Sequence, residues 1–540
     1  RGSGNSLVIS NGGQVHSGRG VNIGEWETSS NNSVLVTGSN SLWTNAGALN
    51  VGEEGSGNSL VISNGGALHN GGYAGIGYYA NSSNNTVLVT DGGTWTNARG
   101  LSVGESGSGN SLVISNGGVV AITQEGYIGY ESTSSNNSVL VTGTNSLWTN
   151  SGDLSVGSSG SSNGLVISNG GKVANQLGYI GYNAVSSNNS VVVTGTNSLW
   201  TNSSLYVGRE GSSNSLVISN GGKVASFLYG YIGESTSSSN NSVLVTGTDS
   251  LWTNSGDLIV GYEGGGNSLV ISNGGTVAVD STSGIGVIAL SSNNAVLVTG
   301  TNSLWTNSSD LIVGNEGSGN SLVISNGGEV FVGTNLVISA QAGASNNSVS
   351  ISGGSLTVTN GQIDIGRAGS GTLNVTGGTV TVQQLLATNG ANSVITFNGG
   401  TIISKGTTVD NGAAFMIGDT GSGATFIANG GRHDFTNVMI VGFSGSSNSL
   451  TVTNGATVAS AFGTLGANGD ASNNTVLVAG AGSVWTNSAD LFVGYGGSGN
   501  RLVISSGGRA AASAGLIGLD VDSSNNSVLV TGSNSVWTNS

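Results

Sequence analysis

The chain has 540 residues, including 97 glycines, no proline, no cysteine, 11 Lys or Arg and 26 Asp or Glu. Its net charge of −15 excludes the basic surface that nucleic-acid binding requires, and the lack of cysteine excludes disulfides and thiolate metal sites. No segment approaches the roughly 18 consecutive apolar residues of a transmembrane helix, while an apolar fraction of 36% in regular positions argues against disorder.

Within the first 25 residues, three short apolar runs are separated by glycines and small polar residues: Leu7–Ile9, Val15 and Val21–Ile23. Short β-branched runs with alternating polarity predict strands, and nothing in the chain predicts an amphipathic helix. The pattern then returns about every 26 residues, which gives roughly 21 units over the chain. Three short strands per unit, repeated end to end, predict an all-β parallel β-helix (a β-solenoid) with coils about 4.8 Å apart and a length on the order of 100 Å.

An asparagine precedes the first strand of each unit. Amide side chains stacked at one corner of successive coils can hydrogen-bond to one another as a ladder, so we interpret these asparagines as structural. They are Asn5, Asn32, Asn58, Asn85, Asn110, Asn137, Asn163, Asn189, Asn214, Asn241, Asn267, Asn294 and Asn320.

The first strand of each unit has an outward-facing middle residue. Irregular units show this, because Val349-Ser350-Ile351 and Leu373-Asn374-Val375 carry a polar residue in the middle and apolar residues on either side. In the regular units the same middle position is apolar, which predicts a stripe of outward Val and Leu side chains: Val8, Leu35, Val61, Leu88, Val113, Leu140, Val166, Val192, Val217, Leu244, Val270 and Leu297.

A tryptophan phrase, NSVLVTGTNSLWTN at residues 137–150, returns in every second unit. The tryptophans either form a row of exposed platforms or fill the core. Trp95 aligns without gaps on Val15, and Thr94 aligns on Gln14, so the tryptophan takes the inward position. We therefore predict that Trp43, Trp95, Trp148, Trp200, Trp252, Trp305, Trp485 and Trp537 are core residues that alternate with valine on neighbouring coils.

The third strand carries tyrosine at its outward position in four units: Tyr127, Tyr179, Tyr206 and Tyr231. Tyr130 and Tyr182 follow just past the next turn. Since Tyr206 lies on the coil between Tyr179 and Tyr231, three exposed rings should stack at about 5 Å spacing. Such a patch suits a sugar ring or a neighbouring molecule; equally, tyrosine fits an exposed strand without any partner.

No catalytic or metal-binding motif emerges. The outward positions of the first strand hold no acid–base pair, and no G-x-S-x-G, P-loop or H-E-x-x-H motif appears, so we expect neither an enzyme nor a cofactor. His16 and His69 share a register but lie two coils, roughly 10 Å, apart, too far to share a metal ion. Acidic residues recur at one turn, where either solvated carboxylates or bridging calcium would be compatible: Glu25, Glu53, Glu105, Glu131, Glu210, Glu234, Glu263 and Glu316.

The chain divides into three sections: regular units over 1–330, irregular units without the tryptophan phrase over 331–440, and regular units over 441–540. In the middle section we expect a bend, a bulged coil or a change of cross-section, together with a weaker lateral contact. The chain shows no secretion signal and starts and stops within the repeat phrase, so we expect further sequence beyond Arg1 and Ser540.

The phrases GSGNSLVISNGG (Gly107–Gly118) and VTGTNSLWTNSGDLSVG (Val141–Gly157) resemble the repeats of autotransporter-type passenger proteins and PEP-CTERM-associated bacterial surface proteins. The resemblance implies a right-handed β-helix that is secreted by the type V route and held at or beyond the outer membrane. It brings no catalytic motif with it.

Two functions remain open. The first is an extracellular structural rod that associates with copies of itself in a bacterial surface fibre, sheath or matrix, because an apolar stripe over many coils is typical of a covered surface. Val and Leu also simply suit an exposed strand, which is the competing interpretation of the stripe. The second function is that of a passenger adhesin that binds glycans or host surfaces through the tyrosine patch.

Overall fold

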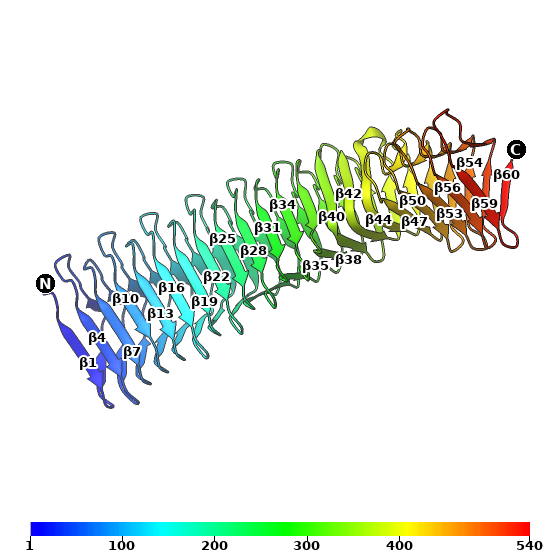
Figure 1. Cartoon of the computed structure of the whole chain (residues 1–540). Helices are drawn as coiled ribbons and strands as arrows, with labels where there is room; N and C mark the ends of the chain where they lie inside the picture. The colour runs from blue at the N-terminus through cyan, green and yellow to red at the C-terminus, as the bar shows by residue number, and fades with distance from the viewer. Residues whose placement is uncertain (1) are drawn as a thin grey trace. The chain divides into compact units, whose positions relative to one another are not determined.

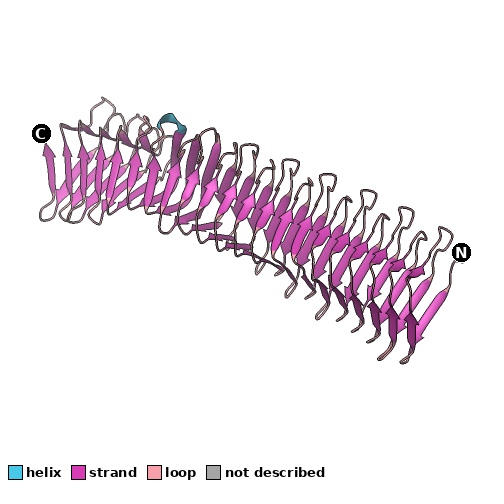
Figure 2. Cartoon of the chain, turned by 180° about the vertical axis from the view of Figure 1, so that it is seen from behind, coloured by secondary structure: helices cyan, strands magenta, loops and turns pink. Residues whose placement is uncertain are grey.

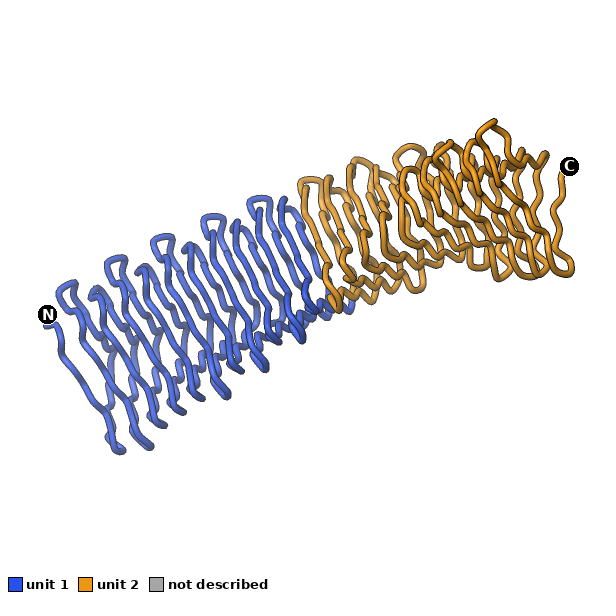
Figure 3. The backbone as a smooth tube through the Cα atoms, in the orientation of Figure 1, with its two compact units in different colours: residues 1–280 blue, residues 281–540 orange. Residues whose placement is uncertain are grey.

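A computed structural model describes residues 2–540 and divides the chain into two compact units, Arg1–Asp280 and Ser281–Ser540 (Figure 3). Each unit is a β-solenoid. Together they hold about 21 turns of about 26 residues, which confirms the predicted fold class. Within residues 2–540 the only helical element is one 3-10 turn, η1 (Gly390–Asn392) (Figure 2), and no helix in that range is long and apolar enough to cross a membrane.

Each coil of unit 1 has three strands, and the strands of successive coils pair in parallel to form three walls. Wall 1 consists of the first strands, which lie side by side in Figure 1. They are β1 (Ser6–Ser10), β4 (Ser33–Thr37), β7 (Ser59–Ser63), β10 (Thr86–Val89), β13 (Ser111–Ser115), β16 (Ser138–Thr142), β19 (Gly164–Ser168), β22 (Ser190–Thr194), β25 (Ser215–Ser219), β28 (Ser242–Thr246) and β31 (Ser268–Ser272).

Wall 2 contains the second strands: β2 (Gln14–Ser17), β5 (Leu42–Asn45), β8 (Ala67–Asn70), β11 (Thr94–Asn97), β14 (Val119–Ile122), β17 (Leu147–Asn150), β20 (Lys172–Ala174), β23 (Leu199–Asn202), β26 (Lys223–Ser226), β29 (Leu251–Asn254) and β32 (Thr276–Val279). Wall 3 contains the third strands: β3 (Val21–Ile23), β6 (Leu49–Val51), β9 (Ala74–Ile76), β12 (Leu101–Val103), β15 (Gly126–Ile128), β18 (Leu154–Val156), β21 (Leu177–Ile180), β24 (Ser204–Val207), β27 (Gly230–Ile232) and β30 (Leu258–Val260).

Seven of the eight predicted tryptophans fill the core, as the alignment with valine predicts, but the prediction is wrong for Trp537, which is only half-buried on the last coil of unit 2. Trp43, Trp95, Trp148, Trp200, Trp252, Trp305 and Trp485 are at most 1% exposed. Trp148 pairs with Val120 on one side and Val173 on the other. Its indole lies over Gly126 of wall 3, where an added Cβ would come within 3.1 Å of the ring. Glycine in the third strand therefore makes room for the indole of the next coil.

The asparagine ladder is present at the corner before wall 1. The backbone N–H and the side-chain Nδ2 of Asn137 both donate to Oδ1 of Asn163, at 3.0 and 3.1 Å, and Asn110 donates in the same two ways to Oδ1 of Asn137. Asn137 is 1% exposed. The ladder satisfies buried backbone donors at each corner, so these asparagines are structural.

Unit 2 begins with regular coils built from β33 (Ser283–Ile285), β34 (Ala295–Thr299), β35 (Leu304–Asn307), β36 (Leu311–Val313), β37 (Ser321–Ser325), β38 (Glu329–Val332) and β39 (Leu336–Ile338). The first and second strands then merge into 12-residue strands, β40 (Asn347–Val358), β42 (Gly371–Val382) and β44 (Ser393–Ser404), which alternate with β41 (Gln362–Ile365) and β43 (Gln384–Ala387). The pairing register shifts within these long strands, as in a β-bulge. Bulged coils therefore do occur in the section where the sequence becomes irregular.

After β44 the first, second and third strands of each coil each move to the neighbouring wall. An extra strand, β46 (Phe415–Ile417), follows β45 (Thr407–Val409), and the N–H of Gly418 donates to the carbonyl of Phe397 in the first half of β44. The next first strand, β47 (Thr425–Asn429), pairs with the second half of β44. The next second strand, β48 (Arg432–Phe435), pairs with β45, which itself continues the third strands through β43. First strands thus continue wall 2 beyond this point.

The remaining strands keep the rotated arrangement to the end of unit 2. They are β49 (Met439–Val441), β50 (Ser449–Thr453), β51 (Thr457–Ser460), β52 (Gly463–Leu465), β53 (Thr475–Ala479), β54 (Val484–Asn487), β55 (Leu491–Val493), β56 (Arg501–Ser505), β57 (Arg509–Ala512), β58 (Gly515–Ile517), β59 (Ser527–Thr531) and β60 (Val536–Asn539).

Candidate functional site

Wall 1 of unit 1 carries the predicted apolar stripe in a continuous row. The middle residues of neighbouring first strands are direct register partners from Val8 to Val270, for example Leu140 between Val113 and Val166. Most members are half-buried by their neighbours; Val8 is 58% exposed and Val166 36%. The flanking residues, such as Val139 and Val141, are buried, so the middle residues face outward. The twelfth predicted member, Leu297, has the same register relation to Val323 in unit 2.

Hydroxyl groups flank this stripe. Most first strands of unit 1 begin with serine and end with serine or threonine, and the hydroxyls at the ends of the strands bond in pairs across coils, as Ser168 does to Thr142 at 2.9 Å. Ser219 and Thr194 form the equivalent contact at 2.9 Å. No first strand of unit 1 contains a charged residue. Wall 1 therefore offers an apolar, uncharged row between hydroxyl groups.

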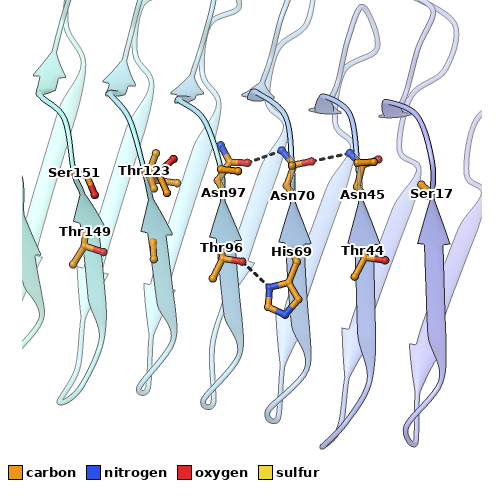
Figure 4. Close-up of a pocket in the computed structure, with 15 residues that line it drawn as sticks. Ser17, Thr44, Asn45, His69, Asn70, Thr96, Asn97, Thr123, Thr149 and Ser151 are labelled. Atoms are coloured by element: carbon orange, nitrogen blue, oxygen red, sulfur yellow. Dashed lines mark hydrogen bonds between the residues drawn. The ribbon is translucent and has the colours of Figure 1, made fainter.

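Wall 2 has a groove of about 720 Å³ over six neighbouring coils, from β2 to β17 (Figure 4). Asn45 donates to Asn70 at 2.7 Å, and Asn70 donates to Asn97 at 2.5 Å. Nδ1 of His69 lies 2.6 Å from the hydroxyl oxygen of Thr96. The short side chains around these residues leave the groove open but put no carboxylate or cationic side chain against it.

The two histidines of wall 2 lie in one column, with Thr44 between His16 and His69. Each ring bonds to a threonine of the next coil, and the two do not face a common point. Within residues 2–540, no cluster of three or more His, Cys, Asp or Glu side chains has the geometry to hold a metal ion.

The acidic turn has protein partners at several of its carboxylates. Arg209 lies 3.9 Å from Glu210 and 3.6 Å from Glu234, and the hydroxyl of Tyr73 donates to Glu105 at 2.6 Å. Burial, and then the charges of Glu25 and Glu54, raise the pKa of Glu53. Arg209 thus lies beside two of the carboxylates, whereas Glu53 has like-charged neighbours.

Wall 3 of unit 1 carries the tyrosine column. Tyr206 stacks on Tyr179 at 5.1 Å between ring centroids and on Tyr231 at 5.2 Å, which agrees with the predicted spacing. One part of the prediction is wrong: Tyr179 is only 7% exposed, because Tyr206 stacks on its ring and Tyr182 packs edge-on against it at 4.8 Å. The other rings of the column are half-buried. Burial, followed by neighbouring charge, raises the pKa of Tyr127 and of Tyr231 to about 12.

A cavity of about 350 Å³ opens in this wall between Tyr127 and Tyr179. Tyr130 lies edge-on to Tyr127 at 4.7 Å, so each side of the cavity has two rings. Ser155 forms its floor, and three carboxylates line it: Glu125, Glu131 and Asp153. The sequence analysis identified the tyrosines but did not predict the cavity. The feature that could have predicted it is the small side chain of Ser155, which lies between two tyrosines in the outward column.

Comparison with known proteins adds little. No family model and no curated protein sequence matches the chain. Among solved structures, it is similar to the "Crystal structure of TibC-catalyzed hyper-glycosylated TibA55-350 fragment", at 15% sequence identity over 76% of this chain and 97% of that chain. The TM-score is 0.24, so no argument about fold or function rests on this similarity.

Proposed function

We propose that this protein is an extracellular structural protein of a bacterial surface, with no catalytic activity, and that it associates with further copies of itself side by side through wall 1 of unit 1. The observation that carries the proposal is the unbroken register of outward Val and Leu side chains from Val8 to Val270. Apolar surface that extends over so many coils is typical of a face covered by a partner.

The size of wall 1 supports this proposal. Ten steps of about 4.8 Å between coils give a strip roughly 48 Å long, and a five-residue strand is about 16 Å wide. Their product is close to the ~800 Å² per partner that a specific protein interface buries. One wall of unit 1 is therefore large enough for a stable contact.

The side chains of wall 1 favour the same wall of a second copy as the partner surface. The wall has no charged residue, so two copies face to face would bury no unpaired charge. The hydroxyls at the ends of its strands already bond in pairs within the wall, as at Ser168 and Thr142. Two such faces would bring branched apolar side chains together with little desolvation of polar groups.

The test is sedimentation velocity over a range of protein concentrations. The parent should form larger species as concentration rises. A double variant, Leu140→Lys with Val192→Lys, places like charges on the contact and should remain monomeric. The matched control, Thr149→Lys with Thr201→Lys, puts the same charges on wall 2 and should assemble as the parent does. A parent that is monomeric throughout, or a wall 1 variant that assembles like the parent, would contradict the proposal.

A second candidate function is glycan binding by an adhesin, which the stack of Tyr179, Tyr206 and Tyr231 favours. The half-buried rings of Tyr206 and Tyr231 offer contact area with little side-chain entropy to lose. Replacing these three tyrosines together with serine, followed by glycan-array binding, tests this function. Loss of glycan binding with assembly intact would support the adhesin function. Unchanged glycan binding by the variant, or no glycan binding by the parent, would exclude this function.

A further inference from the structure

The cavity at Ser155 is the position of a missing ring in the tyrosine column. The outward residues of wall 3 pair in the order Tyr127, Ser155, Tyr179. On the next coils, Tyr206 fills the equivalent position between Tyr179 and Tyr231, with ring spacings of 5.1 and 5.2 Å. Where Ser155 takes the position of a tyrosine, the column has a cavity in place of a ring.

The shape of this space selects a flat group. Tyr127 and Tyr179 are two coils, roughly 9.6 Å, apart, and each is held edge-on by a second ring, Tyr130 or Tyr182. Tyr179 is 7% exposed and Ser155 4% exposed, whereas Tyr127 is half-buried, so a planar group in the cavity would stack mainly on the ring of Tyr127.

The charge of the cavity selects a cation. Glu125, Glu131 and Asp153 line it, and no Lys or Arg is among its lining residues. Asp153 accepts one hydrogen bond, from the N–H of Leu177 at 3.0 Å. Burial raises the pKa of Asp153, and the charge of Glu125 raises it further, while the hydrogen bond from Leu177 opposes part of this increase. A cation in the cavity would offset the repulsion between these carboxylates.

The same wall already shows the interaction that such an occupant would make. The guanidinium carbon of Arg209 lies 4.4 Å from the ring centroid of Tyr182, while its nitrogens lie near the carboxylates of Glu210 and Glu234. A planar cation on a tyrosine face beside carboxylates is therefore a stable arrangement on this surface. A neutral sugar would stack equally well but would leave the carboxylates uncompensated.

We propose that the cavity between Tyr127 and Tyr179 binds a planar organic cation, namely the guanidinium group of an arginine side chain presented by a partner protein. The guanidinium would stack on the ring of Tyr127, beside Tyr179, and donate hydrogen bonds to Asp153 and Glu125. This site lies on wall 3 and does not depend on self-association through wall 1.

The test uses the full chain and three small probes: N-acetylarginine amide, N-acetyllysine amide and methyl glucoside. Ligand-observed NMR titration measures the affinity for each. The arginine derivative should bind most tightly, and its binding should weaken as salt is added. Ser155→Tyr should abolish binding because it completes the column, and Glu125→Gln with Asp153→Asn should weaken it by about tenfold or more.

Ile259→Tyr is the matched control. Ile259 is the outward residue next to Tyr231, so this variant adds a tyrosine at the far end of the column and leaves the cavity open; its affinity should equal that of the parent. The double charge variant preserves the shape of the cavity, which keeps the test decisive if Ser155→Tyr disturbs the coil. No binding of the arginine derivative, equal binding by Ser155→Tyr, or tighter binding of the lysine derivative or the glucoside would overturn the proposal.

Discussion

The regular coils of unit 1 and the coils of β40, β42 and β44 in unit 2 have the same alternation of buried and outward residues in their strands. They differ in the turn between the first and second strands. In unit 1 the first and second strands are separated by a turn in which Asn116 and Gly117 both have positive φ, 46° and 77°. In β40 that position reads Ser352-Gly353-Gly354, and the strand continues through it with a shift in register. The corner residues, not the core, thus decide where a strand ends.

The same comparison explains why the repeat can rotate by one wall. The corner ladder of asparagines holds the first strand at one corner throughout unit 1, and it is interrupted where Gly371 and Ser393 occupy the ladder position. Without amides at this corner, the extra strand β46 changes the wall of every later strand. The ladder resumes at Asn448, Asn474 and Asn500 after the rotation, so it satisfies buried donors on either side of it.

The largest expected effect is on the core of the regular coils. Trp148→Ala removes a fully buried indole and should lower the stability of the surrounding coils by about 3–5 kcal/mol. Hydrogen exchange of the amides in β14, β17 and β20 measures the effect. Leu147→Ala, the outward neighbour in the same strand, is the control and should cost much less; equal losses for the two variants would contradict the inward assignment of the tryptophan.

A smaller effect is expected from the ladder. Asn137→Ala leaves the backbone N–H of buried Asn110 without its acceptor, at a cost of about 1–3 kcal/mol, while Nδ2 of Asn110 keeps the carbonyls of Ser82 and Ser108 as acceptors. Ser138→Ala, at the exposed next position, is the control. Faster exchange confined to the corners of neighbouring coils is the predicted result; an unchanged exchange pattern would show that the ladder contributes no stability.

The smallest effect concerns the tyrosine column at high pH. The pKa values of Tyr127 and Tyr231 are raised to about 12, above the ordinary value of about 10, chiefly by burial. The unfolded chain therefore ionises first, so the stabilisation is complete below pH 10 and is lost as the pH rises from about 10 to 12. Ultraviolet titration should show a late phenolate step that becomes smaller in Tyr127→Phe with Tyr231→Phe but persists, because burial also raises the pKa values of Tyr73, Tyr179 and Tyr206. Complete ionisation of the parent near pH 10 would contradict this prediction.

Much of unit 1 was predictable because one period repeats there without interruption. The aligned pair Trp95 and Val15 was enough to assign the tryptophans to the core, and the polar Ser350 was enough to orient the first strand. The rotation in unit 2 was not predictable, because Phe415–Ile417 has the composition of any short strand and only its pairing reveals that it is an addition.

The candidate surfaces were predictable to different degrees. An outward position in a strand follows from alternation, so the stripe and the tyrosine column could be assigned from the sequence. The burial of Tyr179 depends on the edge-on contact with Tyr182 from the next turn, which no periodicity describes. The division into sections 1–330, 331–440 and 441–540 stays a prediction; the compact units meet instead at residues 280 and 281.

Site-specific disulfide formation tests self-association through wall 1 most directly, because the chain contains no cysteine of its own. Leu140→Cys places one thiol in the stripe, and Thr149→Cys places one on wall 2 as the control. Under mild oxidation, Leu140→Cys should form covalent dimers at protein concentrations where Thr149→Cys remains monomeric. Equal dimer yields for the two variants, or none for Leu140→Cys, would contradict the account.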